Sequence, residues 1–352
     1  MISFIEHNMY LKHKMPNILE SPRRLQVIKK ALTTAGIYNH PEVKVLTPEP
    51  IEETALKDIH SDQLIELIKH GSMIGDVAIT ADTIIGEHTF SAALLAVAGT
   101  KLAAEEALKE GNTFAFAFVR PPGHHATRTN AMGFCFFNNV AFTANYLLKM
   151  KKAKRVMIFD FDNHYGNGTA DLFYNRSDIL KASIHANPNY SFPFQGRVYE
   201  IGEKDGEGYN ICIPLPLQAG DLEALHAFDK FIVPIAREYK PEILLVSAGY
   251  DGLREDPYGH LSYSTFGFQV LSERIKKLAE ELCGGKVIYS LEGGYKFKEL
   301  GEAVLASISP FLKDFDYAKE PEKKLLSGGN ISEYKETLQA LRKILKPFWR
   351  LD

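Results

Sequence analysis

The sequence has few cysteines, no long apolar run and no excess of charge of one sign. Its cysteines, Cys135, Cys212 and Cys283, are odd in number and widely spaced, so neither a disulfide framework nor a Cys-x-x-Cys metal site is available. This usage favours a reducing compartment. No window of about 18 uninterrupted apolar residues occurs, and the N-terminus lacks the apolar core of a signal peptide. We therefore expect a cytoplasmic protein without a membrane partner.

The net charge of the chain bears on which macromolecules it can bind. Lys and Arg number 41 against 44 for Asp and Glu, which gives a net charge of −3 and no basic excess for binding a phosphate backbone. We therefore expect no nucleic-acid partner. Hydrophobic residues make up 45% and charged residues 24% of the 352 residues, which excludes disorder, collagen and coiled coil as overall descriptions. No internal repeat or composition shift marks a boundary, so we predict one domain over 1–352.

Short apolar runs alternate with longer segments that have helical spacing. Continuous apolar runs predict strands buried on both faces, as in a parallel sheet. These runs lie at 114–119, 156–159, 243–246 and 287–291. The predicted crossover helices lie at 91–109, 137–152, 221–239 and 264–282. The pattern predicts a single-domain α/β fold with a mostly parallel central sheet flanked by helices. An exposed connection over 318–332 is expected before a last helix, roughly 332–346.

The segment 185–210 is long and rich in Gly, Pro and Asn, yet it carries aromatic residues that include Phe192 and Phe194. Long loops in compact domains are usually functional, and aromatic rings on a loop need something to pack on. The segment is either a wall of a substrate site or a loop that is pinned to the core, and the sequence does not choose between the two.

Polar clusters follow the four apolar runs directly. They are Arg-Pro-Pro-Gly-His-His at 120–125, Asp-Phe-Asp-Asn-His-Tyr-Gly-Asn-Gly at 160–168, Ser-Ala-Gly-Tyr-Asp at 247–251 with Asp-Pro-Tyr-Gly at 256–259, and Leu-Glu-Gly-Gly-Tyr at 291–295. In an open parallel sheet, ligands bind outside the carboxyl ends of the strands. The four clusters are therefore expected to converge on one crevice.

The second and third clusters predict a metal site. In extended backbone, residues i and i+2 point the same way, so Asp162 and His164 present an oxygen and a nitrogen to one ion, with Asp160 one step further back. Asp251 leaves another strand end and would supply a third ligand. An Asp, His, Asp set with open positions is typical of catalytic zinc, and iron(II) would accept the same ligands.

The remaining clusters predict acid–base groups. His124 and His125 follow a Pro-Pro-Gly turn, so both rings are expected to face one site, where one takes a proton and the other is held by a carboxylate. Tyr295 follows two glycines that let the chain approach a ligand, and its hydroxyl would face a developing oxyanion. Cys135 has no evident base nearby, which disfavours a nucleophilic role.

These motifs resemble a known family. Arg-Pro-Pro-Gly-His-His, Gly-Phe-Cys-Phe-Phe-Asn-Asn, Asp-x-Asp-x-His-x-Gly-Asn-Gly-Thr, Ala-Gly-Tyr-Asp and Leu-Glu-Gly-Gly-Tyr occur in the order of the zinc-dependent histone deacetylases and their bacterial relatives, the acetylpolyamine amidohydrolases and acetoin-utilisation proteins. The resemblance covers roughly 13–310. It implies the arginase/deacetylase fold and hydrolysis of an N-acetyl amide to acetate and a free amine.

The resemblance also implies roles for individual residues. The zinc ligands would be Asp162, His164 and Asp251; His125 would be the general base and then acid. The partners of the histidines and the carbonyl-binding group would be His124, Asp160, Asn167 and Tyr295. The acyl tunnel would be lined by Gly133 and Phe134, with Phe192 or Phe194 as the opposite wall, and Asp82 would grip the substrate main chain. A structural K⁺ or Na⁺ would lie at Asp160, Asp162, His164, Ser183 and Ile184.

Two positions depart from the family pattern. Tyr165 stands where a second histidine is usual, which should alter hydrogen bonding behind the metal without removing a ligand. Tyr258 occupies the variable position of Asp-Pro-x-Gly, where a glutamate recognises a substrate cation in one polyamine-preferring branch. The substrate is left open between an acetylated lysine peptide, an acetylpolyamine and a small acyl amine. A ureohydrolase of the same fold and a catalytically silent binding protein are the alternatives. The oligomeric state is also open, and a homo-oligomer would narrow the tunnel mouth.

Overall fold

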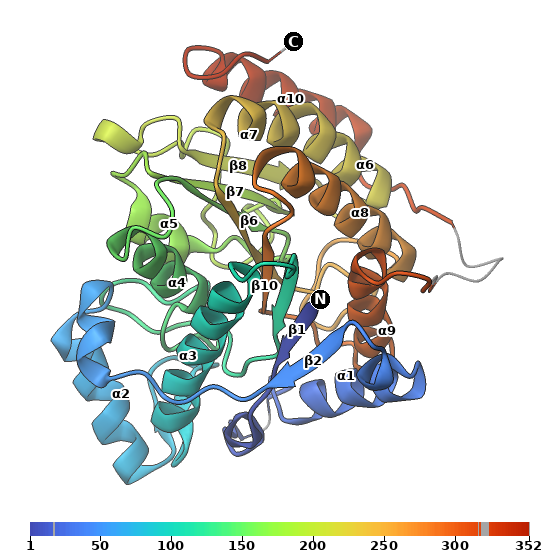
Figure 1. The fold of residues 1–352 in the computed structure, drawn as a ribbon. Coiled ribbons are helices and arrows are strands. Elements are labelled where there is room, and N and C mark those ends of the chain that lie inside the picture. Colours follow the sequence, from blue (N-terminus) through green and yellow to red (C-terminus); the bar gives the residue numbers. More distant parts are fainter. Residues whose placement is uncertain (17, 316, 318–323, 352) are drawn as a thin grey trace.

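The four apolar runs form the centre of a parallel sheet in the computed structural model, which describes residues 1–16, 18–315, 317 and 324–351. Its strand order is β2-β1-β5-β10-β9-β6-β7-β8 (Figure 1). The eight strands are β1 (Ile2–Ile5), β2 (Val43–Leu46), β5 (Phe114–Ala117), β6 (Val156–Asp160), β7 (Ile179–Ala186), β8 (Asn210–Leu215), β9 (Ile243–Ala248) and β10 (Val287–Leu291). All the strand pairs in this sheet are parallel. The predicted α/β class with a parallel central sheet is confirmed.

Helices cover both faces of the sheet (Figure 1). One face carries α2 (Asp62–Ile74), α3 (Thr89–Ala107) and α4 (Asn139–Lys149). The other carries α1 (Arg23–Thr34), α6 (Asp221–Ala227), α7 (Val233–Tyr239), α8 (Thr265–Leu282), α9 (Phe297–Ile308) and α10 (Ile331–Leu345). The short helix α5 (Asn167–Phe173) follows the second polar cluster, and a two-stranded hairpin joins β3 (Val77–Ala78) to β4 (Ile84–Ile85).

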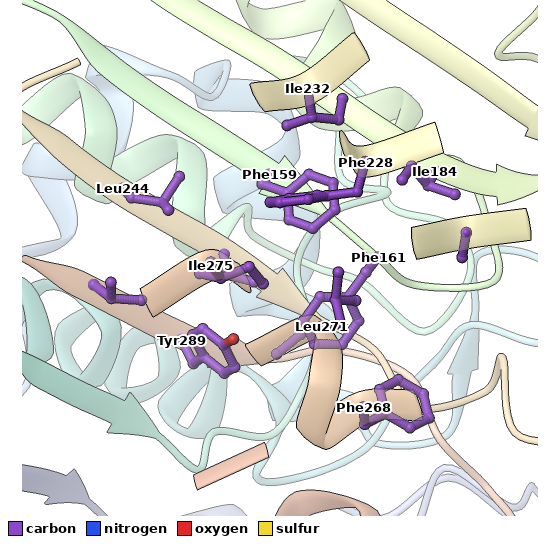
Figure 2. Close-up of a cluster of buried hydrophobic side chains, with 14 of the residues drawn as sticks. Phe159, Phe161, Ile184, Phe228, Ile232, Leu244, Phe268, Leu271, Ile275 and Tyr289 are labelled. Carbon is purple, nitrogen blue, oxygen red and sulfur yellow. The ribbon is translucent and has the colours of Figure 1, made fainter. Parts of the chain in front are cut away.

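The core on the α8 face is largely aromatic. Figure 2 shows Phe159 and Tyr289 of the sheet close to Ile275 and Leu271 of α8. Phe161 packs edge-on against Tyr289, with ring centroids 5.9 Å apart. These strands are buried on both faces, because helices cover each side, and this explains why their sequences are continuous apolar runs.

One predicted helix and one predicted connection need a correction in detail. The segment predicted as one helix over 221–239 is α6 and α7 joined by a π-helical turn at Phe228–Ile232. Pro234 has no N–H to donate to the preceding turn, which accounts for the wider turn at this point. Within the predicted exposed connection, 318–323 lies outside the described residues. The part that follows is anchored, since Leu326 N donates to Asp221 Oδ2 at 2.8 Å.

The pattern of apolar runs did not predict β1, β2, β7 or β8. Strand β7 carries Lys181, Ser183 and His185 at alternate positions, and all three are buried. A polar face that is enclosed by the protein does not look like a buried strand in sequence, because nothing local indicates what will cover it.

We expect His60 to make the stability of the protein pH-dependent. Its Nδ1 lies 2.9 Å from Thr127 O and its Nε2 accepts a hydrogen bond from Asn138 N at 2.9 Å, so the ring must be neutral. Burial lowers the pKa of His60 to about 4. The folded pKa lies below the unfolded value of about 6.5, so this contribution is complete above pH 6.5 and is lost as the pH falls toward 4.

At pH 5 the loss from His60 is about 2 kcal/mol relative to pH 7. The measurement is the free energy of urea unfolding at both pH values for the wild type and His60→Gln. The variant should lose about 2 kcal/mol less than the wild type on acidification. Equal losses in the two proteins would contradict the assignment.

Candidate active site

The four polar clusters line one cavity of about 470 Å³ at the carboxyl edge of the sheet. This follows from the strand order, since β5, β10, β9 and β6 are neighbours and all are parallel. The lining residues from the clusters are Pro122, His124, His125, Asp162, His164, Asp251, Pro257, Tyr258, Gly259, Gly293 and Tyr295. The predicted convergence of the clusters is thus present in the structure.

Asp162, His164 and Asp251 form a compact set of side chains, the ligand trio. Their ligand atoms all lie within 4.8 Å of one another. His164 Nδ1 is 3.0 Å from Asp251 Oδ2 and 3.3 Å from Asp162 Oδ1. Main-chain N–H groups fix the carboxylates, since Gly293 N donates to Asp162 Oδ2 and Asn163 N donates to Asp251 Oδ1, each at 2.8 Å.

Glycine is required where the chain passes this trio. A Cβ atom on Gly249 would lie 1.9 Å from Asp162 Oδ2, and one on Gly293 would lie 2.2 Å from Asp251 Oδ2. Any side chain at either position would displace a carboxylate. The glycines of Ala-Gly-Tyr-Asp and Leu-Glu-Gly-Gly-Tyr therefore serve close approach of backbone to the trio.

The electrostatics of the trio suit a cation. Burial, together with the charge of Asp162, raises the pKa of Asp251 to about 7. Burial would lower the pKa of His164, but the carboxylates of Asp251 and Asp162 raise it to about 10. The two buried carboxylates therefore draw positive charge to their site. Two oxygen donors and one imidazole with open positions fit a divalent metal ion such as Zn²⁺ or Fe²⁺.

His124 and His125 both face the cavity, with ring centroids 4.0 Å apart, but they have different partners. His124 Nδ1 lies 3.0 Å from Asp160 Oδ2, whereas His125 Nδ1 lies 2.8 Å from the amide oxygen Asn167 Oδ1. Burial would lower the pKa of His124, but Asp162 and Asp160 raise it to about 10. Burial and the neighbouring His124 hold the pKa of His125 well below its usual value. The pKa of His124 is thus raised and that of His125 lowered by their different surroundings.

The turn that carries the histidines is held by Glu292. Its Oε2 accepts hydrogen bonds from Gly123 N at 2.7 Å and His124 N at 3.1 Å. Burial raises the pKa of Glu292 to about 7. Because Glu292 lies three residues before Tyr295, this carboxyl joins the histidine turn to the segment that carries the tyrosine. No pattern in the sequence predicted this contact of Glu292.

Tyr295 is positioned through its main chain and through its ring. Its main-chain N donates to Asp256 Oδ2 at 2.7 Å, and the Arg24 guanidinium lies 4.9 Å from the ring centroid. Arg24 Nε also donates to Gly294 O at 2.8 Å. The hydroxyl group of Tyr295 makes no hydrogen bond within the described residues, and the side chain lines the cavity. The hydroxyl is therefore available to a ligand.

The residues predicted to contact the substrate, apart from Phe194, line the cavity. They are Gly133, Phe134, Phe192, Tyr258 and Asp82. Gly133 has a φ of +55°, and a Cβ atom there would lie 2.6 Å from His125 Cδ2 and 3.0 Å from Phe192 Cε1. The wall is continuous around the ring of Phe134, whose centroid is 5.7 Å from those of Tyr258 and Tyr295.

Of the two alternatives for the opposite wall, Phe192 lines the cavity and Phe194 does not. The alternative that Phe194 forms the wall is excluded because its ring is 62% exposed and does not line the cavity. Phe192 takes that place instead, with its ring centroid 5.0 Å from that of His125. The loop 185–210 thus contributes one aromatic ring to the cavity, whereas Tyr190 and Tyr199 are 50% and 64% exposed.

Tyr165 lies behind the trio and turns away from it. Its hydroxyl donates to Asn210 Oδ1 at 3.2 Å, and the ammonium group of Lys181 lies 3.5 Å from its ring centroid. The residues predicted for the monovalent cation lie at the end of β6 and in the middle of β7, because Asp160 pairs with Ser183 in the sheet and Ile184 follows. Ser183 Oγ lies 2.8 Å from His185 Nδ1. A K⁺ or Na⁺ ion at these residues stays a prediction.

Cys135 is buried beneath the cavity. Burial and the nearby Glu292 hold the pKa of its thiol well above the usual value, and Sγ donates to Gly133 O at 3.3 Å. A thiol that stays protonated is a poor nucleophile, in agreement with the sequence argument.

His260 lines the cavity and was not predicted as a site residue. It follows Asp-Pro-Tyr-Gly directly, so its neighbourhood in sequence was the available signal. Ile18 and Ala81, which also line the cavity, carry no such signal.

The parallel sheet and this cavity define an α/β protein with the polar groups of a hydrolase at the carboxyl ends of its strands. A family model described as the histone deacetylase domain matches residues 18–310, and the chain belongs to the histone deacetylase family, whose members are hydrolases that act on amide bonds. The crystal structure of the HDA15 HD domain superposes with a TM-score of 0.88 and 29% identity over 99% of this chain and 96% of that one. The match favours the deacetylase interpretation over the ureohydrolase alternative.

Named relatives agree with this family. A probable deacetylase of Archaeoglobus fulgidus is 32% identical, over 98% of this chain and 97% of its own length. Histone deacetylase 10, chloroplastic, of Oryza sativa subsp. japonica is 37% identical, over 85% of this chain and 68% of the relative. Histone deacetylase 18 of Arabidopsis thaliana is 34% identical, and the match spans 50% of that protein. Across the described ranges, we find no helix whose length and apolar content would let it span a bilayer.

Proposed function

We propose that this protein is a metal-dependent deacetylase that hydrolyses the amide between an acetyl or related acyl group and an amine. The observation that carries the proposal is the arrangement around one cavity of the ligand trio, His125 with its Nδ1 on the amide oxygen of Asn167, and the unpaired hydroxyl of Tyr295. The substrate stays open between an acetylated lysine peptide, an acetylpolyamine and a small acyl amine. A cytoplasmic location and the lack of a nucleic-acid partner stay predictions, as does the oligomeric state.

Asp162, His164 and Asp251 would hold the metal ion, with zinc as the first expectation and iron(II) as the second. A divalent ion at that place lowers the pKa of a water molecule and polarises an acyl carbonyl. The charge of the two carboxylates and their fixed main-chain partners support this assignment.

The tautomer of His125 follows from its partner. Because Nδ1 faces the amide oxygen of Asn167 at 2.8 Å, Nδ1 carries the hydrogen and Nε2 keeps a lone pair. His125 Nε2 is therefore the group that takes the proton of the attacking water, and it later returns that proton to the leaving amine. His124, paired with Asp160, stays charged and stabilises negative charge in the cavity.

The hydroxyl of Tyr295 donates to the acyl oxygen as negative charge develops on it. The rings of Phe134 and Phe192 enclose the aliphatic stem that joins the amide to the rest of the substrate. The C–N bond breaks, the amine leaves with the proton from His125, and acetate is the second product.

The test is acetate release by the zinc-loaded protein from an acetyl-lysine peptide and from N-acetylputrescine. We expect acetate from at least one of them. Absence of acetate from both, with zinc bound, would contradict the proposed reaction on acetyl groups and would favour longer acyl groups or a silent binding protein.

A further inference from the structure

His260 is held rigidly at the wall of the cavity by its main chain. Its N–H donates to Asn163 Oδ1 at 2.8 Å, and its carbonyl accepts from Gln218 N at 2.7 Å. Asn163 is fully buried and sits between Asp162 and His164, so the loop of His260 is fixed directly to the segment that carries two of the trio. The position of the imidazole is therefore set by the site itself.

The two nitrogens of the His260 ring are not equivalent. Nδ1 is buried without a hydrogen-bond partner in the described part of the chain, and the half-buried ring lines the cavity, which leaves Nε2 exposed to it. A buried N–H without an acceptor is costly, so the hydrogen belongs on Nε2. His260 thus presents an N–H donor to whatever occupies the outer part of the cavity.

Asp82 supplies a hydrogen-bond acceptor at the same wall. Asp82 lines the same cavity and uses Oδ1 to accept from the hydroxyls of Thr80 and Thr83 at 2.5 and 3.0 Å, which leaves Oδ2 without a partner within the described residues. Among the described lining residues, none is Lys or Arg, and His260 is the histidine that belongs neither to the trio nor to the His124 and His125 pair. Beside the hydroxyl of Tyr258, the wall therefore offers the acceptor Asp82 and the donor His260.

We propose that His260 is a specificity-determining residue that donates a hydrogen bond to a carbonyl or carboxylate oxygen of the substrate. This inference rests on the proposed function and distinguishes among its substrate classes. A lysine residue carries a carbonyl oxygen and an N–H or ammonium group at the end of its stem, which matches His260 and Asp82. A polyamine offers N–H and ammonium donors, which Asp82 can receive, but beyond its acyl group it has no carbonyl or carboxylate oxygen to accept from His260. His260 therefore favours a substrate that carries a carbonyl or carboxylate oxygen at the far end of its stem over one that carries only amines there.

The experiment uses two substrates that differ by one group. Nε-acetyl-lysine amide and N-acetylcadaverine share the acetyl group, the stem and the terminal amine, and the second lacks the carboxamide. We expect the wild type to favour the first in kcat/KM by about 2- to 10-fold, which is the contribution of one hydrogen bond. His260→Ala should lower kcat/KM for the amide by a similar factor and leave N-acetylcadaverine unchanged. His260→Gln, whose Nε2 can occupy the place of the imidazole Nε2, should recover part of the preference.

Different failures have different meanings. Equal losses on both substrates in His260→Ala, or a His260→Gln variant no better than His260→Ala, would show a structural role and overturn the inference. A wild type that releases acetate from neither substrate with zinc bound would contradict the proposed function and the role of His260 together. Tyr199→Phe, on an exposed ring, is the control variant and should behave as the wild type does on both substrates.

Discussion

Asp251→Ala is expected to lower acetate release by about 1000-fold or more and to abolish stoichiometric metal binding. The substitution removes one of three ligands and leaves Asp162 and His164, which cannot fix a divalent ion with the same geometry. A metal ion supplies several kcal/mol of charge stabilisation in a hydrolytic reaction, which corresponds to about that factor in rate. Metal content by elemental analysis and initial rates of acetate release are the two measurements.

A nearby acidic residue provides the matched control. Glu255 lies four residues away in the same loop, and its side chain is 77% exposed, so Glu255→Gln should keep both metal and activity. Chelation should inactivate the wild type, and added zinc should restore it but should not restore Asp251→Ala. Full activity of Asp251→Ala without bound metal would refute the assignment of the trio.

Tyr295→Phe is the second change with a large expected effect. Removing the hydroxyl should lower kcat by about 10²- to 10³-fold, because an oxyanion donor acts mainly on the transition state. KM should change little, and metal content should remain, since Tyr295 is not in the trio. Steady-state kinetics with elemental analysis separates these quantities. The ring should stay in place because Arg24 and Asp256 hold the segment independently of the hydroxyl.

Tyr289→Phe is the control for loss of a buried hydroxyl, because Tyr289 lies on β10, the strand that precedes Tyr295. Tyr289 lies within the core of Figure 2, and its hydroxyl is 3.0 Å from Ser272 Oγ, away from the cavity. We expect a small loss of stability and no loss of kcat. An unchanged kcat in Tyr295→Phe would contradict the proposed role of its hydroxyl. A histidine would then have to donate the hydrogen bond to the oxyanion.

The sequence was most informative where local geometry dictates direction. Asp162 and His164 follow the end of β6 closely and both join the trio as predicted, although the backbone over 162–164 is a bend and not the extended segment that the prediction assumed. Parallel strands bring their carboxyl ends to one edge, so the clusters after β5, β6, β9 and β10 had to meet if these runs formed one sheet. Periodicity and strand direction are properties of the chain itself, which is why these expectations needed no tertiary information.

The irregular segments were less predictable. Phe192 and Phe194 lie two residues apart in one loop, and both were candidates for the wall. Phe192 packs on His125, whereas Phe194 has a φ of +64° and faces solvent. No periodicity links neighbouring side chains in a loop, so their directions depend on what the loop packs against.

The sequence by itself determined the α/β class, the strand ends that carry polar groups and the set of residues that meet there. Only the tertiary structure decided which loop aromatic forms the wall, that Glu292 holds the turn of His124, and that His260 faces the cavity. Those three features depend on contacts between segments far apart in the chain, such as His260 N with Asn163 Oδ1. Strand periodicity is set by the local backbone, whereas such contacts exist only once the sheet has brought the loops together.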